Sequence, residues 1–326
     1  MRALSEAAID AFALAADASG IYWTTPANEL WVLRTEHGAP ERLAADADAG
    51  PDCQPPSPPL LAGGFIFWMG SARSALHRTR ADGAGDDIVA PTVRGDNLTA
   101  DATNVYWTEA LGSYGQGAGA VRSLPIAAAP SASPVTLVAA AVNDEIASLA
   151  VRDGVLYWTP FAAIGATQYS AVMRSAPLAT LAPAGGEAGV VVSVPSSPSG
   201  LFAEADALYF THFPNLWTTA VARLPADGRP VEPLVTLPTE QSGESVAIAG
   251  DSLVVTAANV SRGCGATPAL NLFAAPTDGG PPSLIADQLR TAAIAAPAGI
   301  VFVAADGRLT AMSLDYVRAL RVALAP

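Results

Sequence analysis

The sequence predicts an all-β chain that folds as a seven-bladed β-propeller of four-stranded antiparallel blades. One phrase recurs along the whole chain, each copy lies in a unit with four strand-like segments, and helical patterning is nearly absent. The sharpest copies are "GIYWTT" from Gly20, "FIFWMG" from Phe65, "NVYWTE" from Asn104 and "VLYWTP" from Val155. Weaker copies are "ALYFTH" from Ala207, "SLVVTA" from Ser252 and "GIVFVA" from Gly299.

Each unit contains the same four pieces. A strand of small residues leads into a turn with Asp or Gly, then come the aromatic strand, a third strand that often carries Arg, and a closing strand. The turn acids are Asp17, Asp101, Asp153, Asp206 and Asp251, and the third-strand arginines are Arg34, Arg78, Arg174 and Arg223. Asp-Gly hairpin signals precede several closing strands, at Asp82-Gly83, Asp227-Gly228 and Asp278-Gly279. Four strands in roughly 40–50 residues are typical of one propeller blade.

The units divide the chain into one domain, 1–326, with blades at 12–46, 58–91, 96–140, 146–194, 199–238, 244–287 and 291–326. Six or eight blades are the alternatives to seven. Ring closure has two solutions. Either the last unit completes its own fourth strand at Leu320 to Leu324, or residues near Leu4 to Ile9 add to the last blade.

Burial explains the repetition. A lone blade exposes both of its faces, whereas stacked blades cover each other with alternate residues of every strand. In the aromatic strand of the third unit, Tyr106 is therefore expected on one face of its blade, with Val105 and Trp107 on the other. The Tyr-Trp pairs are interpreted as packing between blades, not as a ligand site.

Composition excludes several classes of function. The 326 residues are 51% hydrophobic and carry a net charge of −13, which argues against phosphate-driven nucleic-acid binding and against binding to anionic membranes. No uninterrupted apolar run is long enough for a spanning helix. The start, "MRALSEAAIDAFALAAD", is broken by Glu6 and Asp10 and is a poor signal peptide. The protein is then either cytoplasmic or has lost a leader, and we expect a monomer.

The phrase D-x-x-x-V-Y-W-T, from Asp101 to Thr108, resembles bacterial Tyr-Trp-Thr repeat β-propeller proteins, which look like relatives of the NHL and TolB-type propellers. The resemblance covers essentially the whole chain and is sharpest in the first four units. Many of those proteins are predicted to be lipoproteins or secreted, so the resemblance favours an extracytoplasmic location. It implies the fold and says almost nothing about activity, since propellers host lyases, lactonases, binders and scaffolds.

Strand order favours one face of the ring for function. Connections between strands two and three, and from one blade to the next, emerge on the same face, and these are the long and irregular ones: "TEALGSYGQGAGA", "TPFAAIGATQYSA", "THFPNLWTTA", "TAANVSRGCGATPA" and "DADAGPDCQPPSPP". They carry the aromatic residues Tyr114, Phe161, Tyr169, Phe213 and Trp217. Such aromatics suit stacking on a sugar, a ring-bearing small molecule or a peptide. Alternatively, they fold inward and cap the loops.

Two candidate catalytic residues occupy equivalent positions in units three and five. Glu109 and His212 each lie two residues after the second member of the aromatic pair and are expected at the channel mouth. There they could do acid–base chemistry or hold a divalent metal, or play a structural role. His77 is expected on an outer strand and His37 in a turn, which disfavours a three-histidine cluster. No nucleophile elbow, phosphate-binding loop or H-E-x-x-H motif occurs.

The two cysteines, Cys53 and Cys264, fall in long connections expected on the same face. They form either a disulfide that pins the two loops or two separate free thiols.

These observations lead to three functional hypotheses. The first is a binding module for a small molecule, glycan or protein, with no cofactor, that uses the long-loop face. The second is a lyase or hydrolase, similar to virginiamycin B lyase or lactonase-type propellers, with Glu109 and His212 at the channel mouth. The third is a purely structural surface protein.

Overall fold

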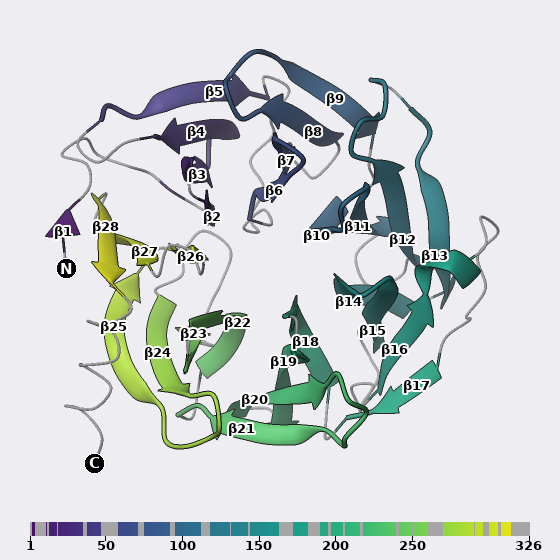
Figure 1. Cartoon of the computed structure of the whole chain (residues 1–326), viewed down its shortest axis with the longest axis vertical. Coiled ribbons are helices and arrows are strands. Elements are labelled where there is room, and N and C mark those ends of the chain that lie inside the picture. The colour runs from purple at the N-terminus through teal and green to yellow at the C-terminus, as the bar shows by residue number, and fades with distance from the viewer. Residues whose placement is uncertain are drawn as a thin grey trace.

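The computed structural model describes the chain apart from residues 1, 4–10, 12, 18, 35–37, 47–57, 71–74, 92–94, 112–117, 131, 143, 163–171, 182–189, 195–196, 205, 216–217, 239–240, 250, 260–269, 290, 296–299, 306–307 and 314–326. The described strands form seven four-stranded antiparallel sheets arranged in a ring (Figure 1). Helical structure in the described residues is confined to one 3-10 turn, η2, at Leu178–Thr180. The all-β architecture is thus as predicted.

Six of the sheets are each built from four consecutive strands, and we number these blades in chain order. Blade 1 contains β2 (Ala13–Asp17), β3 (Gly20–Thr24), β4 (Glu29–Leu33) and β5 (Glu41–Ala45). Blade 2 contains β6 (Leu60–Ala62), β7 (Phe65–Met69), β8 (Ala75–Arg80) and β9 (Asp86–Pro91). Blade 3 contains β10 (Gly95–Ala100), β11 (Asn104–Leu111), β12 (Ala118–Pro125) and β13 (Val135–Val142).

Blades 4 to 6 follow the same pattern. Blade 4 contains β14 (Asp144–Arg152), β15 (Val155–Ala162), β16 (Val172–Pro177) and β17 (Val190–Ser193). Blade 5 contains β18 (Ser197–Ala203), β19 (Ala207–Asn215), β20 (Thr218–Pro225) and β21 (Glu232–Thr236). Blade 6 contains β22 (Gln241–Ala249), β23 (Ser252–Asn259), β24 (Leu270–Pro276) and β25 (Ser283–Leu289).

The remaining sheet corrects the predicted architecture. It takes three strands from the C-terminal unit, β26 (Thr291–Ala295), β27 (Ile300–Ala305) and β28 (Arg308–Ser313), and its outer strand is β1 (Arg2–Ala3) from the other end of the chain. Arg2 pairs with Ala311 and Ala3 with Thr310. The prediction of seven blades that are each four consecutive strands is therefore wrong: six sheets have that form, and the last is composite.

The reason for the correction is the free edge of β28. An unpaired edge strand leaves a row of backbone N–H and C=O groups without partners, and the N-terminal segment pairs with them. The alternative solution for ring closure correctly predicted that the N-terminal segment adds a strand to the last sheet. The described residues that form this pairing are Arg2 and Ala3. The segments proposed earlier for this role, Leu4 to Ile9 and Leu320 to Leu324, lie outside the described residues.

Packing between blades follows the alternation of strand two, as predicted. Tyr106 is buried against the next blade, in one cluster with Leu149, Leu156 and Trp158. Trp107 lies on the opposite side of β11 and packs on the preceding blade, in a cluster with Phe67. The rule recurs around the ring: Tyr209 joins the core of blade 6, whereas Phe210 joins that of blade 4. In the blades that carry it, the aromatic pair therefore joins the blade to both of its neighbours.

The acid before the aromatic strand has a local role that explains the repeated phrase. Asp101 Oδ1 accepts hydrogen bonds from the backbone N–H of Thr103 (2.7 Å) and Asn104 (2.8 Å), and Asp101 Oδ2 accepts one from the Tyr106 hydroxyl (2.6 Å). Burial raises the pKa of Asp101, but these donors outweigh it and lower the pKa overall. Asp17 caps the equivalent turn of blade 1.

Removal of β1 tests the composite sheet. Deletion of residues 1–3 exposes the edge of β28, and we expect the melting temperature to fall by about 2–4 °C in a calorimetric scan. A variant with Arg2→Thr and Ala3→Thr keeps the backbone pairing and should melt close to the wild type. An unchanged melting temperature after the deletion would mean that β1 does not stabilise the sheet.

Asp101→Asn tests the turn before β11. We expect it to lower the free energy of unfolding by about 1–2 kcal/mol at pH 7, because it weakens three hydrogen bonds to a charged acceptor. The folded-state pKa of Asp101 is depressed, so its stabilisation is present above the unfolded carboxyl pKa of ~3.9 and is lost as the pH falls through the folded pKa. The difference between wild type and variant in urea unfolding should therefore shrink below about pH 4.

The control is Asp82→Asn, at an exposed turn where Arg80 lowers the pKa of the carboxyl. Solvent screens that pair, so the control should leave the urea midpoint nearly unchanged. An Asp101→Asn effect that stayed constant down to about pH 2.5 would contradict the assignment.

Candidate functional site

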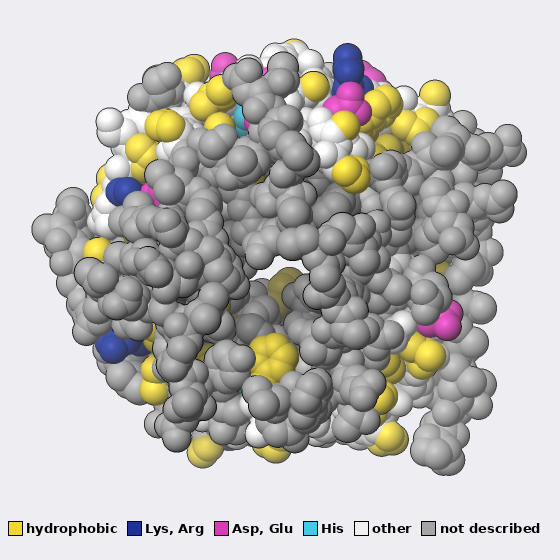
Figure 2. Space-filling view, turned by 180° about the vertical axis from the view of Figure 1, so that it is seen from behind, with side chains coloured by type: hydrophobic (Ala, Val, Ile, Leu, Met, Phe, Trp, Pro, Cys, Tyr) yellow, Lys and Arg dark blue, Asp and Glu magenta, His cyan; other side chains and the backbone are white. Residues whose placement is uncertain are grey.

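Antiparallel order within each sheet divides the connections between two faces. Turns from strand one to two and from strand three to four lie on one face, which we call the turn face. Connections from strand two to three and from one sheet to the next lie on the other, the long-loop face. The second strands end there, at Thr24, Met69, Leu111, Ala162, Asn215, Asn259 and Ala305. Figure 2 views the ring from behind Figure 1 and shows its central opening, with hydrophobic atoms inside.

Strands extend into some of the connections predicted as loops. β19 runs to Asn215 and β20 begins at Thr218, so only residues 216–217 join them. β15 likewise continues to Ala162. The physical reason is continued pairing with the first strand of the same sheet: Phe161 pairs with Glu145, and Phe213 with Ser197. Phe161 and Phe213 therefore lie on extended β-hairpins rather than in loops.

The other predicted ligand-binding aromatics and both cysteines cannot be placed. Tyr114, Tyr169 and Trp217 lie outside the described residues, as do Cys53 and Cys264. Phe213 is half-buried. The aromatic surface and the disulfide therefore remain predictions.

Glu109 is buried at the interface between blades 2 and 3. It lies on the same side of β11 as Val105 and Trp107, which pack on blade 2. Its side chain is 6% exposed, and its Oε2 accepts a hydrogen bond from Nε of Arg122 at 2.6 Å. Arg122 also donates to the Thr136 hydroxyl. The carboxylate is thus part of an ion pair that connects β11 and β12.

His212 is buried in a different interface. It follows Phe210 on the side of β19 that packs on blade 4, and the two rings lie 6.0 Å apart. Burial lowers the pKa of His212, so the imidazole is neutral at pH 7. Glu109 and His212 hold equivalent positions, yet the structure places them in two different interfaces, with blades 3 and 4 between them. It does not bring them together at one reacting centre.

The equivalent position in the other blades reveals a cluster that the sequence analysis missed. It is occupied by Thr25, Gly70, Pro160 and Ala257. At Gly70 the space of a side chain is filled from elsewhere: a Cβ there would collide with Asp46 Oδ2 and would lie 2.8 Å from His77 Nε2. The sequence places His77 only on an outer strand. A glycine where other blades carry Glu or His is the signal that points to this cluster.

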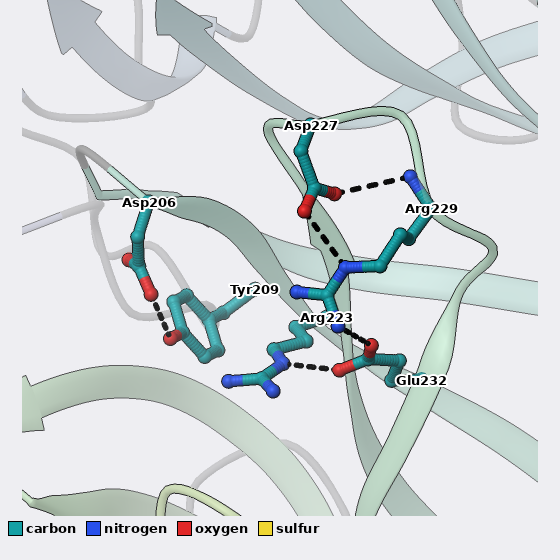
Figure 3. Close-up of polar contacts among 6 residues, drawn as sticks. All are labelled: Asp206, Tyr209, Arg223, Asp227, Arg229 and Glu232. Atoms are coloured by element: carbon teal, nitrogen blue, oxygen red, sulfur yellow. Dashed lines mark hydrogen bonds and ion pairs between the residues drawn. The ribbon is translucent and has the colours of Figure 1, made fainter.

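On the turn face, blade 5 carries a polar network (Figure 3). It comprises Asp206, Tyr209, Arg223, Asp227, Arg229 and Glu232. Glu232 accepts hydrogen bonds from Nε of Arg223 (2.6 Å) and from Nη1 of Arg229 (2.9 Å). The hydrogen bond with Glu232 raises the pKa of Arg223. The charges of Arg223, Arg229, Asp227 and Glu232 are paired with one another, which indicates a structural role in joining β20 to β21.

Two features are absent from the described residues. In that part of the chain no group of three or more His, Cys, Asp or Glu is placed to hold a metal ion. The same residues include no helix that is both long and apolar enough to cross a membrane.

Comparison with known proteins identifies the fold but no family. No family model matches the chain, and no curated protein matches it in sequence. Among solved structures, the extracellular domain of BT4673 from B. thetaiotaomicron matches 95% of this chain with a TM-score of 0.66 at 9% identity, and the match covers 41% of that chain. PorZ, a surface component of the type-IX secretion system of Porphyromonas gingivalis, matches 97% with a TM-score of 0.64 at 11% identity, over 38% of its own chain.

A chain of a mitotic checkpoint complex also has this fold, with a TM-score of 0.61 at 11% identity over 96% of this chain and 92% of the other. At such identities the likeness shows the fold alone. The chain is a β-propeller with bacterial relatives in structure, and membership of the Tyr-Trp-Thr repeat family remains an expectation.

Glu109→Gln tests the ion pair with Arg122. The variant leaves a largely buried guanidinium without its charged partner, and we expect it to lower the free energy of unfolding by about 2 kcal/mol. Because Arg122 is 25% exposed, this value is below that of a fully buried pair. Adding Arg122→Met should recover part of the loss in urea unfolding. A double variant that loses the sum of both single effects would show that the two side chains are not coupled.

Proposed function

We propose that the protein is a binding module that uses the long-loop face around the channel mouth. The observation that carries the proposal is the presence of aromatic residues on β-hairpins that extend from a rigid ring. Phe161 lies on β15 and Phe213 on β19, both near the ends of these strands on this face. A side chain on a regular strand, such as the half-buried Phe213, loses little conformational entropy on binding.

The chemistry of the ligand follows from these residues. The ring of a phenylalanine is flat and apolar, which suits stacking on a sugar ring, a ring-bearing small molecule or a peptide. The net charge of −13 disfavours polyanionic ligands. We therefore propose a neutral glycan, a small molecule or a protein segment as the partner, bound by a monomer.

The enzyme hypothesis needs Glu109 and His212 to act on one substrate. Glu109 is engaged by Arg122, and His212 lies in another interface, so a lyase or hydrolase would have to draw these groups out of their packing. This favours binding over catalysis. A metal assay of the purified protein, followed by a turnover assay of Glu109→Gln, tests the alternative directly.

We also propose an extracytoplasmic location. The resemblance to secreted and lipoprotein propellers supports it. Two structural neighbours are an extracellular domain and a bacterial surface component, which is consistent with this location but shows only that their fold is shared.

The proposal is tested with defined probes. The labelled protein is screened on a glycan array and against a displayed peptide library, and the affinity of the best binder is measured by calorimetry. We expect Phe213→Ala, Trp217→Ala and Tyr169→Ala each to weaken that affinity at least about tenfold, as the loss of a central aromatic anchor does. Arg229→Ala, on the turn face, is the matched control and should bind as the wild type does. Unchanged affinity in all three aromatic variants would overturn the proposal.

A further inference from the structure

We propose that His77 and Asp46 form a divalent transition-metal site at the interface between blades 1 and 2. The ion would be held by the imidazole Nε2 of His77 and the carboxylate of Asp46, and water would complete its coordination. This site lies between two blades rather than in the channel, and it does not depend on the proposed function.

The imidazole of His77 is held in one orientation. His77 lies on β8 directly across from Trp68, and the two rings stack with centroids 4.3 Å apart. Its Nδ1 lies 3.0 Å from Asp86 Oδ2. Asp86 is fixed in turn by the Thr79 hydroxyl, which donates to Oδ1 at 2.6 Å and accepts from Trp68 Nε1 at 3.0 Å. A carboxylate on Nδ1 is the arrangement that fixes metal-binding histidines with Nε2 free to coordinate.

The other nitrogen faces a carboxylate at an unusual distance. His77 is 3% exposed, and its Nε2 is buried without a hydrogen-bond partner. Asp46 Oδ2 lies 3.7 Å away, with 11% of the Asp46 side chain exposed. This separation is too long for an N–H···O hydrogen bond. Two ligands about 2.05 Å from one tetrahedral ion lie roughly 3.4 Å apart, so a shift of a few tenths of an ångström would let both bind it.

Gly70 keeps the space between the two ligands clear. In blades 3 and 5 the same position carries the side chains of Glu109 and His212, which fill their interfaces. A side chain on Gly70 would overlap both Asp46 Oδ2 and His77 Nε2. Glycine therefore allows the carboxylate from blade 1 and the imidazole from blade 2 to approach each other.

Charge favours a cation in this place. The carboxylates of Asp46 and Asp86 approach the two ring nitrogens of His77, so negative charge lies on both sides of the imidazole and favours a cation beside Nε2. One imidazole nitrogen with one carboxylate oxygen suits Zn²⁺, Co²⁺, Ni²⁺ or Cu²⁺ better than Mg²⁺ or Ca²⁺. The bound ion would connect the end of β5 to blade 2.

The test uses Zn²⁺ alone. Chelator-treated protein is titrated with Zn²⁺ by calorimetry, and we expect one equivalent to bind and to raise the melting temperature. The conservative variants Asp46→Asn and His77→Gln should each weaken that binding at least about tenfold. Asp86→Asn should weaken it about tenfold through loss of the orienting contact. Circular dichroism checks that each variant is folded, and Co²⁺ absorption in the wild type reports nitrogen and oxygen ligands.

The matched control is His212→Gln, which removes a buried histidine from another interface and should bind Zn²⁺ as the wild type does. Two results would overturn the proposal. In the first, the wild type takes up no ion, so that a proton or a water fills the gap. In the second, Asp46→Asn binds as tightly as the wild type, so that any bound ion sits elsewhere.

Discussion

The fold depends on one packing constraint, the opposite orientation of two successive aromatic side chains in the second strand of a blade. Tyr106 packs forward onto blade 4 and Trp107 packs back onto blade 2. A single blade cannot bury both residues, because each needs a different neighbour. Stability is therefore cooperative between blades, and the ring must close so that the first and last sheets also have partners. Loops and polar residues can vary as long as this alternation is kept.

The sequence predicts most of the architecture because strand alternation has a period of two and the turns carry Asp or Gly. It correctly oriented Val105, Tyr106 and Trp107. It could not predict the role of Arg2 and Ala3, because two residues carry no strand pattern and their partners, Ala311 and Thr310, are distant in the chain. It also placed Phe213 in a loop. The apolar residues there continue a strand whose length is decided by pairing with Ser197.

The interaction partners of the polar residues on the long-loop face could not be predicted from their positions in the repeat. Glu109 and His212 share a position in the repeat, and the sequence suggested that they share a site. In the ring, equivalent positions are related by rotation about the axis and so belong to different interfaces. Residues from different positions meet instead: Asp46 after β5, Gly70 after β7 and His77 on β8 converge because neighbouring blades stack. Such a group becomes visible only when the contact between two blades is known.

The composite sheet has a consequence for synthesis of the protein. Arg2 and Ala3 leave the ribosome long before their partners on β28, Ala311 and Thr310. Strand β1 therefore stays unpaired until β28 has been synthesised, and only then can the circle be sealed. Contacts of such long range slow folding. A nascent chain that stops short of β28 would leave the wheel open, with β1 unpaired and accessible to proteases.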